Sequence, residues 1–294
     1  MSHQNKQQKK TICGIITLYH PTTNNLHNIN SYISYIDKLF IIDNTPLNDT
    51  ITKSKTIQNY PNTQILSTGK NLGIAAALNL GIHEGLKNRY SWLLTMDQDS
   101  WFDPEQAERF FSSLAEQDSQ TTAIISPAHK ETHNNNDPCH YEKKTEVMTS
   151  GNILNLGLAE KIGFFNEDLF IDSVDHDYCL KANLMGLNVL QATNCHLQHT
   201  IGKNFSGSFF FGIRKRTFAL HSPKRLYFIV RNGLYIIHTY GKDFPTYTHT
   251  LGRHIRVRVS KSIRYGRKRS EYIKYTLKAI YDYKCRKFGN RVNI

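Results

Sequence analysis

The sequence predicts an α/β fold in which an open, mostly parallel sheet is covered by helices on both faces. The first observation is a set of short β-branched or apolar runs, each closed by polar or turn residues, at residues 11–19, 38–44, 63–68, 91–97 and 122–128. Such runs are typical of buried parallel strands. The second observation is that helical patterns lie between them, and strands that alternate with helices form a sheet of this kind.

Two segments between the strands have the spacing of amphipathic helices. In residues 71–89, apolar or small side chains recur at i, i+3, i+4, i+7 and i+8, starting from Ile74. A second helix is expected directly after Asp103, because Pro104 suits a first helical turn and the same spacing recurs from Ala107 to Ala115.

Charge is divided unevenly along the chain. Residues 1–202 carry 15 Lys and Arg against 21 Asp and Glu, whereas residues 203–294 carry 22 against 3. Nucleic acid, an anionic membrane or acidic substrates would suit such a basic end. A helical stripe within it could instead dock on the body of the protein; this stripe consists of Ile273, Leu277, Ile280, Tyr281, Lys284 and Phe288.

The cysteines and the apolar segments bear on the compartment. The five cysteines are odd in number, and no pair has the close spacing of a zinc knuckle or a redox dithiol, so we expect reduced thiols. We find no signal peptide at the N-terminus and no run of roughly 18 apolar residues that would span a membrane. We therefore expect a cytoplasmic protein.

Polar residues gather where the predicted strands end. Open α/β sheets bind ligands at the carboxyl ends of their strands, so Asp43, Asn71, Gly73, Asp97 and Asp99 should line one cleft. Two aspartates there would suit Mg²⁺ or Mn²⁺ held together with substrate phosphates. The alternative is an ordinary turn followed by a helix cap at residue 100 or 103.

The second half of the chain offers a candidate base. Asp172, Asp175 and Asp177 open a third predicted helix, and one of them could take a proton from an acceptor hydroxyl. Carboxylates in a first helical turn can also be simple dipole partners. The apolar face of this helix is predicted to include Val174, Tyr178, Ala182 and Met185. His199 follows an apparent strand and could be either a metal ligand or a structural histidine.

Eight segments, in this order, resemble the large inverting family of nucleotide-sugar glycosyltransferases with the GT-A fold, family 2. They are TLYHP, IDNTP, GKNLGIAAALNLGI, LLTMDQDS, TSGNILN, GFFNEDLFIDSVDHDYCLKANLMGLNVL, LQHTIG and HSPKRLYFIVRN. The resemblance runs from about residue 11 to 240. Within the family, the chain is similar to bacterial rhamnosyltransferases of surface-polysaccharide assembly, also in its ending AIYDYKCRKFGN.

The resemblance implies roles for the residues on the donor side. Residues 97–99 match the metal-binding DxD motif, with Asp99 the direct ligand and Asp97 a second ligand nearer to the ribose and sugar. Asp43 matches an aspartate that contacts the base, and Asn71 with Gly73 matches a loop beside the nucleotide. The metal would be Mg²⁺ or Mn²⁺.

The resemblance also implies roles on the opposite side. His199 matches a histidine that completes the metal shell, and Asp175 falls on the catalytic base position. The usual Glu-Asp pair is Val174-Asp175 here, so the acidic neighbour of the base is missing. Residues near the acceptor are matched by Ser150, Gly151 and Asn152.

The implied reaction is the inverting, metal-dependent transfer of a hexose. The first choice is rhamnose from dTDP-rhamnose, and the alternative is a UDP-linked sugar; the acceptor would be a glycan or a lipid-linked saccharide. Basic residues near anionic lipid contribute about 1 kcal/mol each. We therefore expect the basic end to hold the enzyme peripherally on the inner face of the cytoplasmic membrane, and we expect no nucleic-acid partner.

Three regions are predicted: a disordered N-terminus at 1–10, a GT-A catalytic domain at 11–222, and a basic, aromatic, mainly helical region at 223–294. Two other functions are less consistent with the sequence. A nucleotidyltransferase would need a Gly-rich phosphate loop containing lysine, which residues 11–25 lack. A non-catalytic binding module would have lost site residues, whereas the carboxylates and His199 are present.

Overall fold

The computed structural model describes residues 11–46, 60, 62–67, 69–129, 138–199, 205–208, 215–218 and 220–292. The strands are β1 Ile12–Leu18, β2 Lys38–Asp43, β3 Thr63–Ser67, β4 Trp92–Asp97, β5 Ser100–Phe102, β6 Thr122–Ala128, β7 Tyr141–Lys143, β8 Asn152–Asn155, β9 Asn188–His199, β10 Phe205–Ser208 and β11 Lys215–Phe218. The α-helices are α1 Thr23–His27, α3 Gly73–Lys87, α4 Pro104–Ser113, α5 Leu156–Ile162, α6 Val174–Leu184, α7 Pro223–Tyr240, α8 Pro245–Tyr265 and α9 Arg269–Lys284. The predicted disordered segment, residues 1–10, lies outside the described residues.

The central sheet has the strand order β3-β2-β1-β4-β8-β6-β9-β5, and β7 pairs with β9. Strands β3, β2, β1 and β4 are parallel, as their continuous apolar runs predict. In the other half, β8 runs antiparallel to both β4 and β6, while β6 and β9 are parallel. The predicted α/β class is confirmed, and the antiparallel pairing of β8 is a detail that the sequence did not specify.

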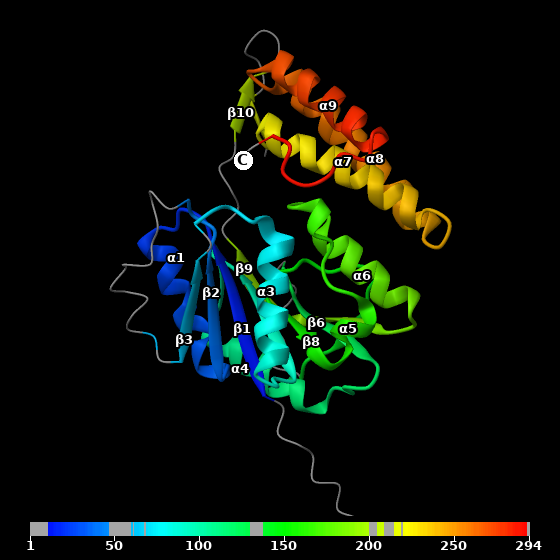
Figure 1. Ribbon diagram of the computed structural model, residues 1–294. Helices are drawn as coiled ribbons and strands as arrows, with labels where there is room; N and C mark the ends of the chain where they lie inside the picture. The colour runs from blue at the N-terminus through cyan, green and yellow to red at the C-terminus, as the bar shows by residue number, and fades with distance from the viewer. Residues whose placement is uncertain are drawn as a thin grey trace, which may run out of the picture.

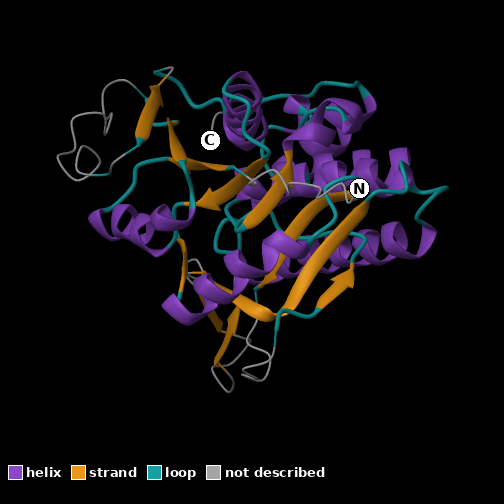
Figure 2. Ribbon diagram, turned by 90° about the horizontal axis from the view of Figure 1, so that it is seen from below, coloured by secondary structure: helices purple, strands orange, loops and turns teal. Residues whose placement is uncertain are grey.

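Helices cover both faces of the sheet (Figures 1 and 2). Helices α3, α5 and α6 share one apolar cluster, to which β1 contributes Ile15. Helices α1 and α4 share the other cluster, to which β1 contributes the next residue, Ile16. Both isoleucines are fully buried, because successive side chains of a strand point to opposite faces and both faces are covered. The predicted helices at 71–89 and after Asp103 are confirmed as α3 and α4.

Helix α6 departs in one respect from its prediction. Val174, Tyr178 and Ala182 are buried, as the apolar spacing indicates. Met185, however, is 44% exposed, so its place on the apolar face was predicted wrongly. The helix ends at Leu184, and Met185 is the cap residue, where the helical spacing no longer directs the side chain inward.

Two cysteines also depart from their prediction. Cys139 and Cys195 form a disulfide, with Cα atoms 6.4 Å apart and a separation of 56 positions in the sequence. The expectation that all five thiols are reduced is therefore wrong for this pair. Pairing of β7 with β9 brings the two segments together, and spacing along the chain does not reveal such pairing. Cys13 and Cys179 are buried free thiols, and Cys285 is exposed.

Helices α7, α8 and α9 form a separate layer above the sheet (Figure 1). They share their own apolar cluster, which includes Phe228, Ile255 and Tyr272. Strand β1 runs upward in this view, so the carboxyl edge of the parallel strands faces the layer. Among the described helices, none is both long enough and apolar enough to cross a membrane.

Candidate active site

The carboxyl ends of the parallel strands meet at one edge, below α7. At the end of β1, Leu18 pairs with Asp43 of β2, and Thr17 pairs with Asp97 of β4. The two aspartates therefore lie on either side of β1 at nearly the same level. This arrangement confirms the predicted gathering of strand-end carboxylates along one edge of the sheet.

On the β2 side, Asp43 is fully buried and accepts a hydrogen bond from the backbone N–H of Thr45 at 2.9 Å. The next residue, Asn44, links this strand end to the start of α3. Its Nδ2 donates to the carbonyl oxygen of Gly73 at 3.1 Å, and its Oδ1 accepts from the N–H of Leu72 at 3.4 Å. The strand end and the helix start are thus held as one unit, a connection that the sequence did not indicate.

Gly73, the first residue of α3, has a backbone conformation that requires glycine. Its φ is +82°, and a Cβ atom there would lie 2.6 Å from the carbonyl oxygen of Phe170. Asn71 Oδ1 accepts the Gly73 N–H at 2.9 Å, and Ile74 N–H donates to Phe170 oxygen at 2.7 Å. Close approach of two backbones explains the glycine, and it places the start of α3 beside the loop that precedes α6.

Gln98, the residue between Asp97 and Asp99, fixes the turn after β4. Gln98 exchanges two hydrogen bonds with the backbone of Tyr19, at 2.9 and 3.2 Å. The side-chain amides of Asn25 and Asn28 both donate to the carbonyl oxygen of Gln98, at 3.1 and 3.0 Å. The turn is therefore tied to the end of β1 and to the α1 region, which holds its two aspartates in place.

Asp99 and His199 come together through the pairing of β5 with β9. Ser100 stands opposite His199 in this ladder, and its Oγ lies 2.9 Å from His199 Nδ1. Asp99 Oδ1 lies 3.4 Å from the same nitrogen. A carboxylate oxygen and an imidazole nitrogen this close fit a divalent cation such as Mn²⁺, with substrate oxygens and water as further ligands. Within the described ranges, no group of three or more His, Cys, Asp or Glu side chains could hold a metal.

Five ionisable side chains at this edge act on one another. Burial and, next, the charge of Asp99 raise the pKa of Asp97 to about 6. Asp175 raises this pKa further, while His199 and Arg225 act in the opposite direction. The two halves of the candidate site, the strand ends and the start of α6, therefore lie within electrostatic reach of each other.

The three aspartates around the start of α6 have different surroundings. Asp177 is buried, and it accepts hydrogen bonds from Tyr240 at 2.7 Å and Tyr235 at 3.3 Å. Asp172 forms a two-point ion pair with Arg225, at 2.5 and 2.8 Å. Through these contacts, both carboxylates hold the start of α6 and the loop before it against α7.

Asp175 is placed differently from the other two aspartates. It lies in the first turn of α6, and its side chain is 25% exposed. Its Oδ1 accepts the backbone N–H of His176 at 3.0 Å. Partial exposure and influence on Asp97 make Asp175 the aspartate of this group that is best placed to meet a bound substrate.

The loop before α6 is strained and is held by α7. Phe170, Asp172 and Ser173 have φ values of 64°, 65° and 63°, and each such residue costs about 1–3 kcal/mol. The buried amide of Asn232 donates to the carbonyl oxygens of residues 169, 171 and 172, at 2.8, 2.7 and 2.9 Å. Its neighbour Arg231 donates to the carbonyl oxygens of residues 168 and 169. Helix α7 therefore stabilises the loop that positions Asp175.

The segment predicted to lie near the acceptor runs beside β4. Ser150 Oγ accepts the backbone N–H of Asp97 at 3.1 Å, and Gly151 N–H donates to Thr95 oxygen at 2.7 Å. Asn152 pairs with Thr95 in the β4–β8 ladder and is buried, as is Ser150. These contacts support the position of Asp97; the role toward an acceptor stays a prediction.

Sequence reasoning missed two residues of this edge. Arg225, in the first turn of α7, belongs to the HSPKRLYFIVRN segment, but no role was assigned to it. His129 directly follows β6, and the rule used for the other strand ends applies to it as well. Burial and the nearby His199 lower the pKa of His129 to about 4, so this histidine is neutral at pH 7.

Comparison with known proteins identifies the family of the chain. Residues 21–180 match the family model described as Glycosyl transferase family 2. The chain belongs to this family. A dTDP-rhamnosyl transferase, RfbF of Shigella flexneri, is 24% identical to it over 253 residues, which are 77% of this chain and 79% of that relative. The predicted family and its GT-A fold are confirmed, and the protein is a glycosyltransferase.

Two solved structures of longer chains are similar to this chain, and the first of them shares its fold. GalNAc-T7 with UDP, GalNAc and Mn²⁺ matches with a TM-score of 0.56 and 9% identity, over 93% of this chain and 55% of that one. S. aureus TarS matches with a TM-score of 0.49 and 12% identity, over 92% of this chain and 43% of that one. This family 2 chain thus spans about half the length of each of these structures.

Proposed function

We propose that this glycosyltransferase moves rhamnose from dTDP-rhamnose, with inversion, onto a glycan or lipid-linked acceptor of a bacterial surface polysaccharide. The observation that carries the proposal is an edge of the sheet where the pKa of Asp97 responds to four other charged side chains: Asp99, His199, Asp175 and Arg225. The Shigella flexneri relative is a dTDP-rhamnosyl transferase that aligns over most of both chains, which supports the choice of sugar and nucleotide. A UDP-linked sugar is the alternative donor.

On the donor side, the nucleotide would lie along the ends of β1 and β2. Asp43 would face the base, while Asn71 and Gly73 would border the nucleotide at the start of α3. Asp99 and His199, with Asp97 beside them, would hold Mg²⁺ or Mn²⁺ on the diphosphate. A metal there would neutralise the charge that develops on the leaving group. Arg225 would add a fixed positive charge at the same edge.

On the acceptor side, Asp175 would act as the general base. An acceptor hydroxyl oxygen attacks the anomeric carbon, its proton passes to the Asp175 carboxylate, and the bond from that carbon to the diphosphate oxygen breaks. Attack opposite to the leaving group in a single displacement inverts the anomeric configuration. Residues 150–152 would border the acceptor, and residues 11–222 would form the catalytic domain.

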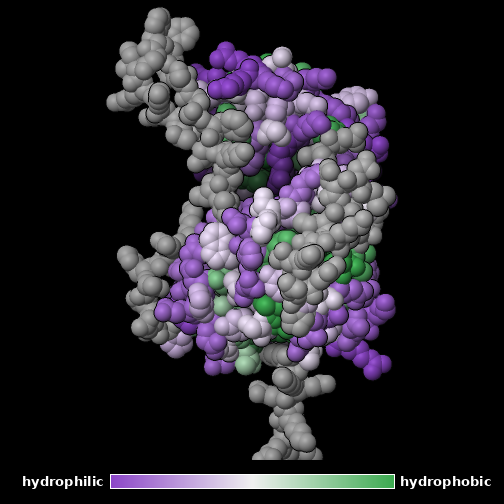
Figure 3. Space-filling view, turned by 90° about the vertical axis from the view of Figure 1, so that its left-hand side faces the viewer, coloured by the Kyte–Doolittle hydropathy of each residue, from purple (hydrophilic) through white to green (hydrophobic). Residues whose placement is uncertain are grey.

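The C-terminal region, residues 223–294, would attach the enzyme to the inner face of the cytoplasmic membrane. Ile273, Leu277 and Tyr281 lie one helical turn apart on α9 and are 44%, 62% and 57% exposed. Ile280 of the predicted stripe instead packs with α7 and α8. One part of the stripe is therefore packed against the protein, and the other part is exposed. Figure 3 shows that hydrophilic side chains cover much of the upper part, where these helices lie. Apolar side chains among many cations suit an anionic bilayer surface.

Calorimetry with nucleotides tests the donor site. The purified protein is titrated with dTDP and with UDP, each with and without Mn²⁺, and the titrations are repeated on Asp99→Ala. We expect binding of dTDP that needs Mn²⁺ and is lost in this variant. The exposed carboxylate Glu105 provides the matched control, because Glu105→Ala removes one negative charge of α4 and leaves the edge intact.

The titrations also decide among the alternatives. A preference for UDP would replace dTDP-rhamnose by a UDP-linked donor within the same family. If neither nucleotide binds when Mn²⁺ is present, the carboxylates form only a turn, and the proposed donor site does not exist in this protein.

A further inference from the structure

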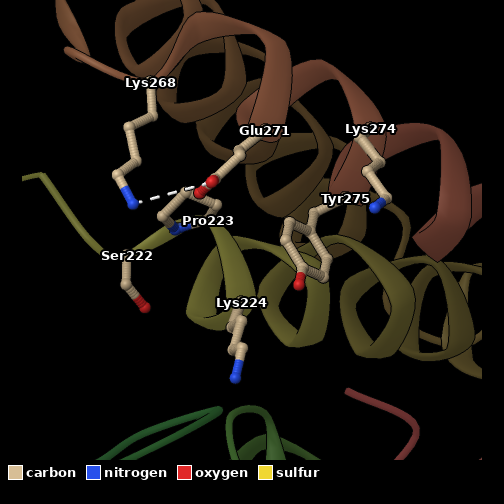
Figure 4. A pocket seen from close by; sticks show the side chains of 7 residues that line it. All are labelled: Ser222, Pro223, Lys224, Lys268, Glu271, Lys274 and Tyr275. Carbon is tan, nitrogen blue, oxygen red and sulfur yellow. Dashed lines mark ion pairs between the residues drawn. The ribbon is translucent and has the colours of Figure 1, made fainter. Parts of the chain in front are cut away.

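The C-terminal layer reaches α6, the helix of the proposed base Asp175, through a tyrosine of α8. A cavity of about 370 Å³ lies between the first turns of α7 and α9, and all of its lining residues, Lys268 and Glu271 among them, belong to the layer itself (Figure 4). Tyr247, in the first turn of α8, instead packs against a cluster that includes Leu180 of α6. Its side chain therefore lies between the layer and the helix that carries Asp175.

Three side chains from three segments of the chain meet beside Asp175. His176 Nδ1 lies 3.0 Å from Glu146 Oε2 and within hydrogen-bond contact of the Tyr247 hydroxyl. That hydroxyl donates to the same Glu146 oxygen at 2.9 Å. Glu146 comes from the segment between β7 and β8, where its neighbour Val147 is buried in the apolar cluster that α6 shares. The imidazole, the carboxylate and the phenol therefore hold one another in place.

Tyr247 is a hydrogen-bond donor in this cluster. Burial and, next, the charge of Glu146 raise the pKa of Tyr247, so the hydroxyl keeps its proton at pH 7. Asp175 raises this pKa as well, which places the proposed base within electrostatic reach of the cluster. The side chains of His176 and Glu146 are 23% and 39% exposed, so their contact is partly shielded from water.

The contacts of His176 Nδ1 determine which ring nitrogen faces the base. A carboxylate only accepts hydrogen bonds, so Nδ1 carries hydrogen toward Glu146. The other nitrogen, Nε2, lies 3.9 Å from Asp175 Oδ1. In the neutral ring, hydrogen on one nitrogen leaves a lone pair on the other, so Nε2 is a hydrogen-bond acceptor beside the base. Hydrogen bonds of catalytic groups are often long before substrate binds, and they shorten in the complex.

We propose that His176 is a positioning residue that acts on Asp175 through Nε2. When Asp175 takes the proton of the acceptor hydroxyl, its carboxylate becomes a carboxyl group, and Nε2 accepts a hydrogen bond that only this protonated form can donate. The contact stabilises the product of proton transfer, while Tyr247 and Glu146 keep the lone pair on that side of the ring. The inference rests on the proposed function, because it takes Asp175 as the base.

Two substitutions separate the roles of the two ring nitrogens. His176→Gln offers an amide near the place of Nε2, whereas His176→Asn offers one near the place of Nδ1. Release of dTDP from dTDP-rhamnose is measured for each variant with Mn²⁺ and with water as the acceptor. We expect His176→Asn to lower the rate about tenfold and His176→Gln to stay within about threefold of the wild type. The matched control is His249→Asn, which replaces an exposed histidine of α8.

A purely structural role of His176 would give the opposite order. If His176→Asn keeps the wild-type rate while His176→Gln loses it, the ring serves only to join Glu146 and Tyr247, and the proposal is wrong. Equal rates in the two variants, whether low or like the wild type, would also overturn it. The affinity for dTDP with Mn²⁺, measured by calorimetry, should be unchanged in both variants, which shows that they are folded.

The contribution of α8 is tested by Tyr247→Phe, which removes the hydroxyl and keeps the ring. We expect the rate to fall about threefold in the otherwise wild-type protein and to stay unchanged when the same substitution is added to His176→Asn, because the two residues act through one contact. A loss of the same size in both proteins would mean that Tyr247 acts without His176, and it would contradict the proposal.

Asp175→Asn separates this inference from the proposed function. If this variant releases dTDP at the wild-type rate, or if the wild type releases no nucleotide from dTDP-rhamnose or from a UDP-linked sugar, the proposed function fails and the inference fails with it. If Asp175→Asn is slow while His176→Asn is as fast as the wild type, the base keeps its role and only the assignment of His176 is wrong.

Discussion

At the residue scale, Asp97 holds a negative charge that its surroundings disfavour. Its pKa rises from 3.8 to about 6, chiefly through burial and then through Asp99. The native protein therefore binds a proton at this carboxyl more readily than the unfolded chain does. The ionised form lowers the stability of the metal-free protein, fully above about pH 6 and not at all below about pH 4.

Replacing this charge should stabilise the empty protein. We expect Asp97→Asn to raise the free energy of unfolding by about 1–2 kcal/mol at pH 7.5 in EDTA. At pH 4, where the wild-type carboxyl is already protonated, the variant and the wild type should be equally stable. Denaturant unfolding at both pH values measures it. Equal stability of the two proteins at pH 7.5 would show that the charge of Asp97 is well solvated.

Asp175 should affect the transfer step rather than donor binding. We expect Asp175→Asn to lower the transfer rate by about 10²–10⁴-fold, because the amide cannot take the acceptor proton. Its affinity for dTDP with Mn²⁺ should stay within twofold of the wild type. Single-turnover rates and calorimetry measure the two quantities, and Asp168→Asn, which changes an exposed carboxylate nearby, is the control. A rate close to that of the wild type would remove Asp175 from the base position.

The sequence allowed the gathering of Asp43, Asp97 and Asp99 to be predicted, because residues at the ends of parallel strands must share an edge. It did not separate Asp175 from Asp172 and Asp177 without the resemblance. Their difference lies in partners on α7, which begins nearly fifty residues later, and no local pattern encodes those contacts.

At the element scale, α7 connects the C-terminal layer to the loop before α6. We expect Asn232→Ala to lower the free energy of unfolding by about 2–4 kcal/mol, since one buried amide serves three carbonyl oxygens. The transfer rate should fall as well, because the loop that carries Asp175 loses its support.

Denaturant unfolding and single-turnover rates test this expectation on folded protein at 15 °C. Asn183→Ala is the matched control, because its amide also donates to two backbone oxygens but lies far along α6 from the loop. A loss of stability without any change in rate would mean that the loop keeps its shape without Asn232.

Periodicity along the sequence was sufficient to predict β1, β2, β4, α3 and α4, since each buries a regular set of side chains. It did not predict β8, which has four residues, or the antiparallel direction of that strand. The disulfide was missed for a related reason, because the pairing of β7 with β9 depends on contacts between distant segments.

At the scale of the whole molecule, an acidic body is followed by a basic C-terminal region. We expect replacement of Ile273, Leu277 and Tyr281 by serine to lower binding to phosphatidylglycerol vesicles at least tenfold, with dTDP binding unchanged. Each residue loses apolar surface that a bilayer would cover. Sedimentation with vesicles measures the effect.

The control replaces Leu184 and Met185, which are 50% and 44% exposed on the catalytic body, by serine. A parallel assay with duplex DNA addresses the rival ligand of a basic surface. Tight binding to duplex DNA without binding to vesicles would contradict membrane attachment.

The hydrogen bonds of Arg231 and Asn232 to the loop 168–172 also affect how chimeras of this protein and its relatives can be built. The sequence suggests a join at residue 222, where the catalytic region gives way to the helices. A chimera cut there would combine the loop of one parent with the supporting helix of another. The segment that must come from the same parent as α7 begins near Asn166. Chimeras made to change acceptor specificity should therefore take the loop and α7 from one parent.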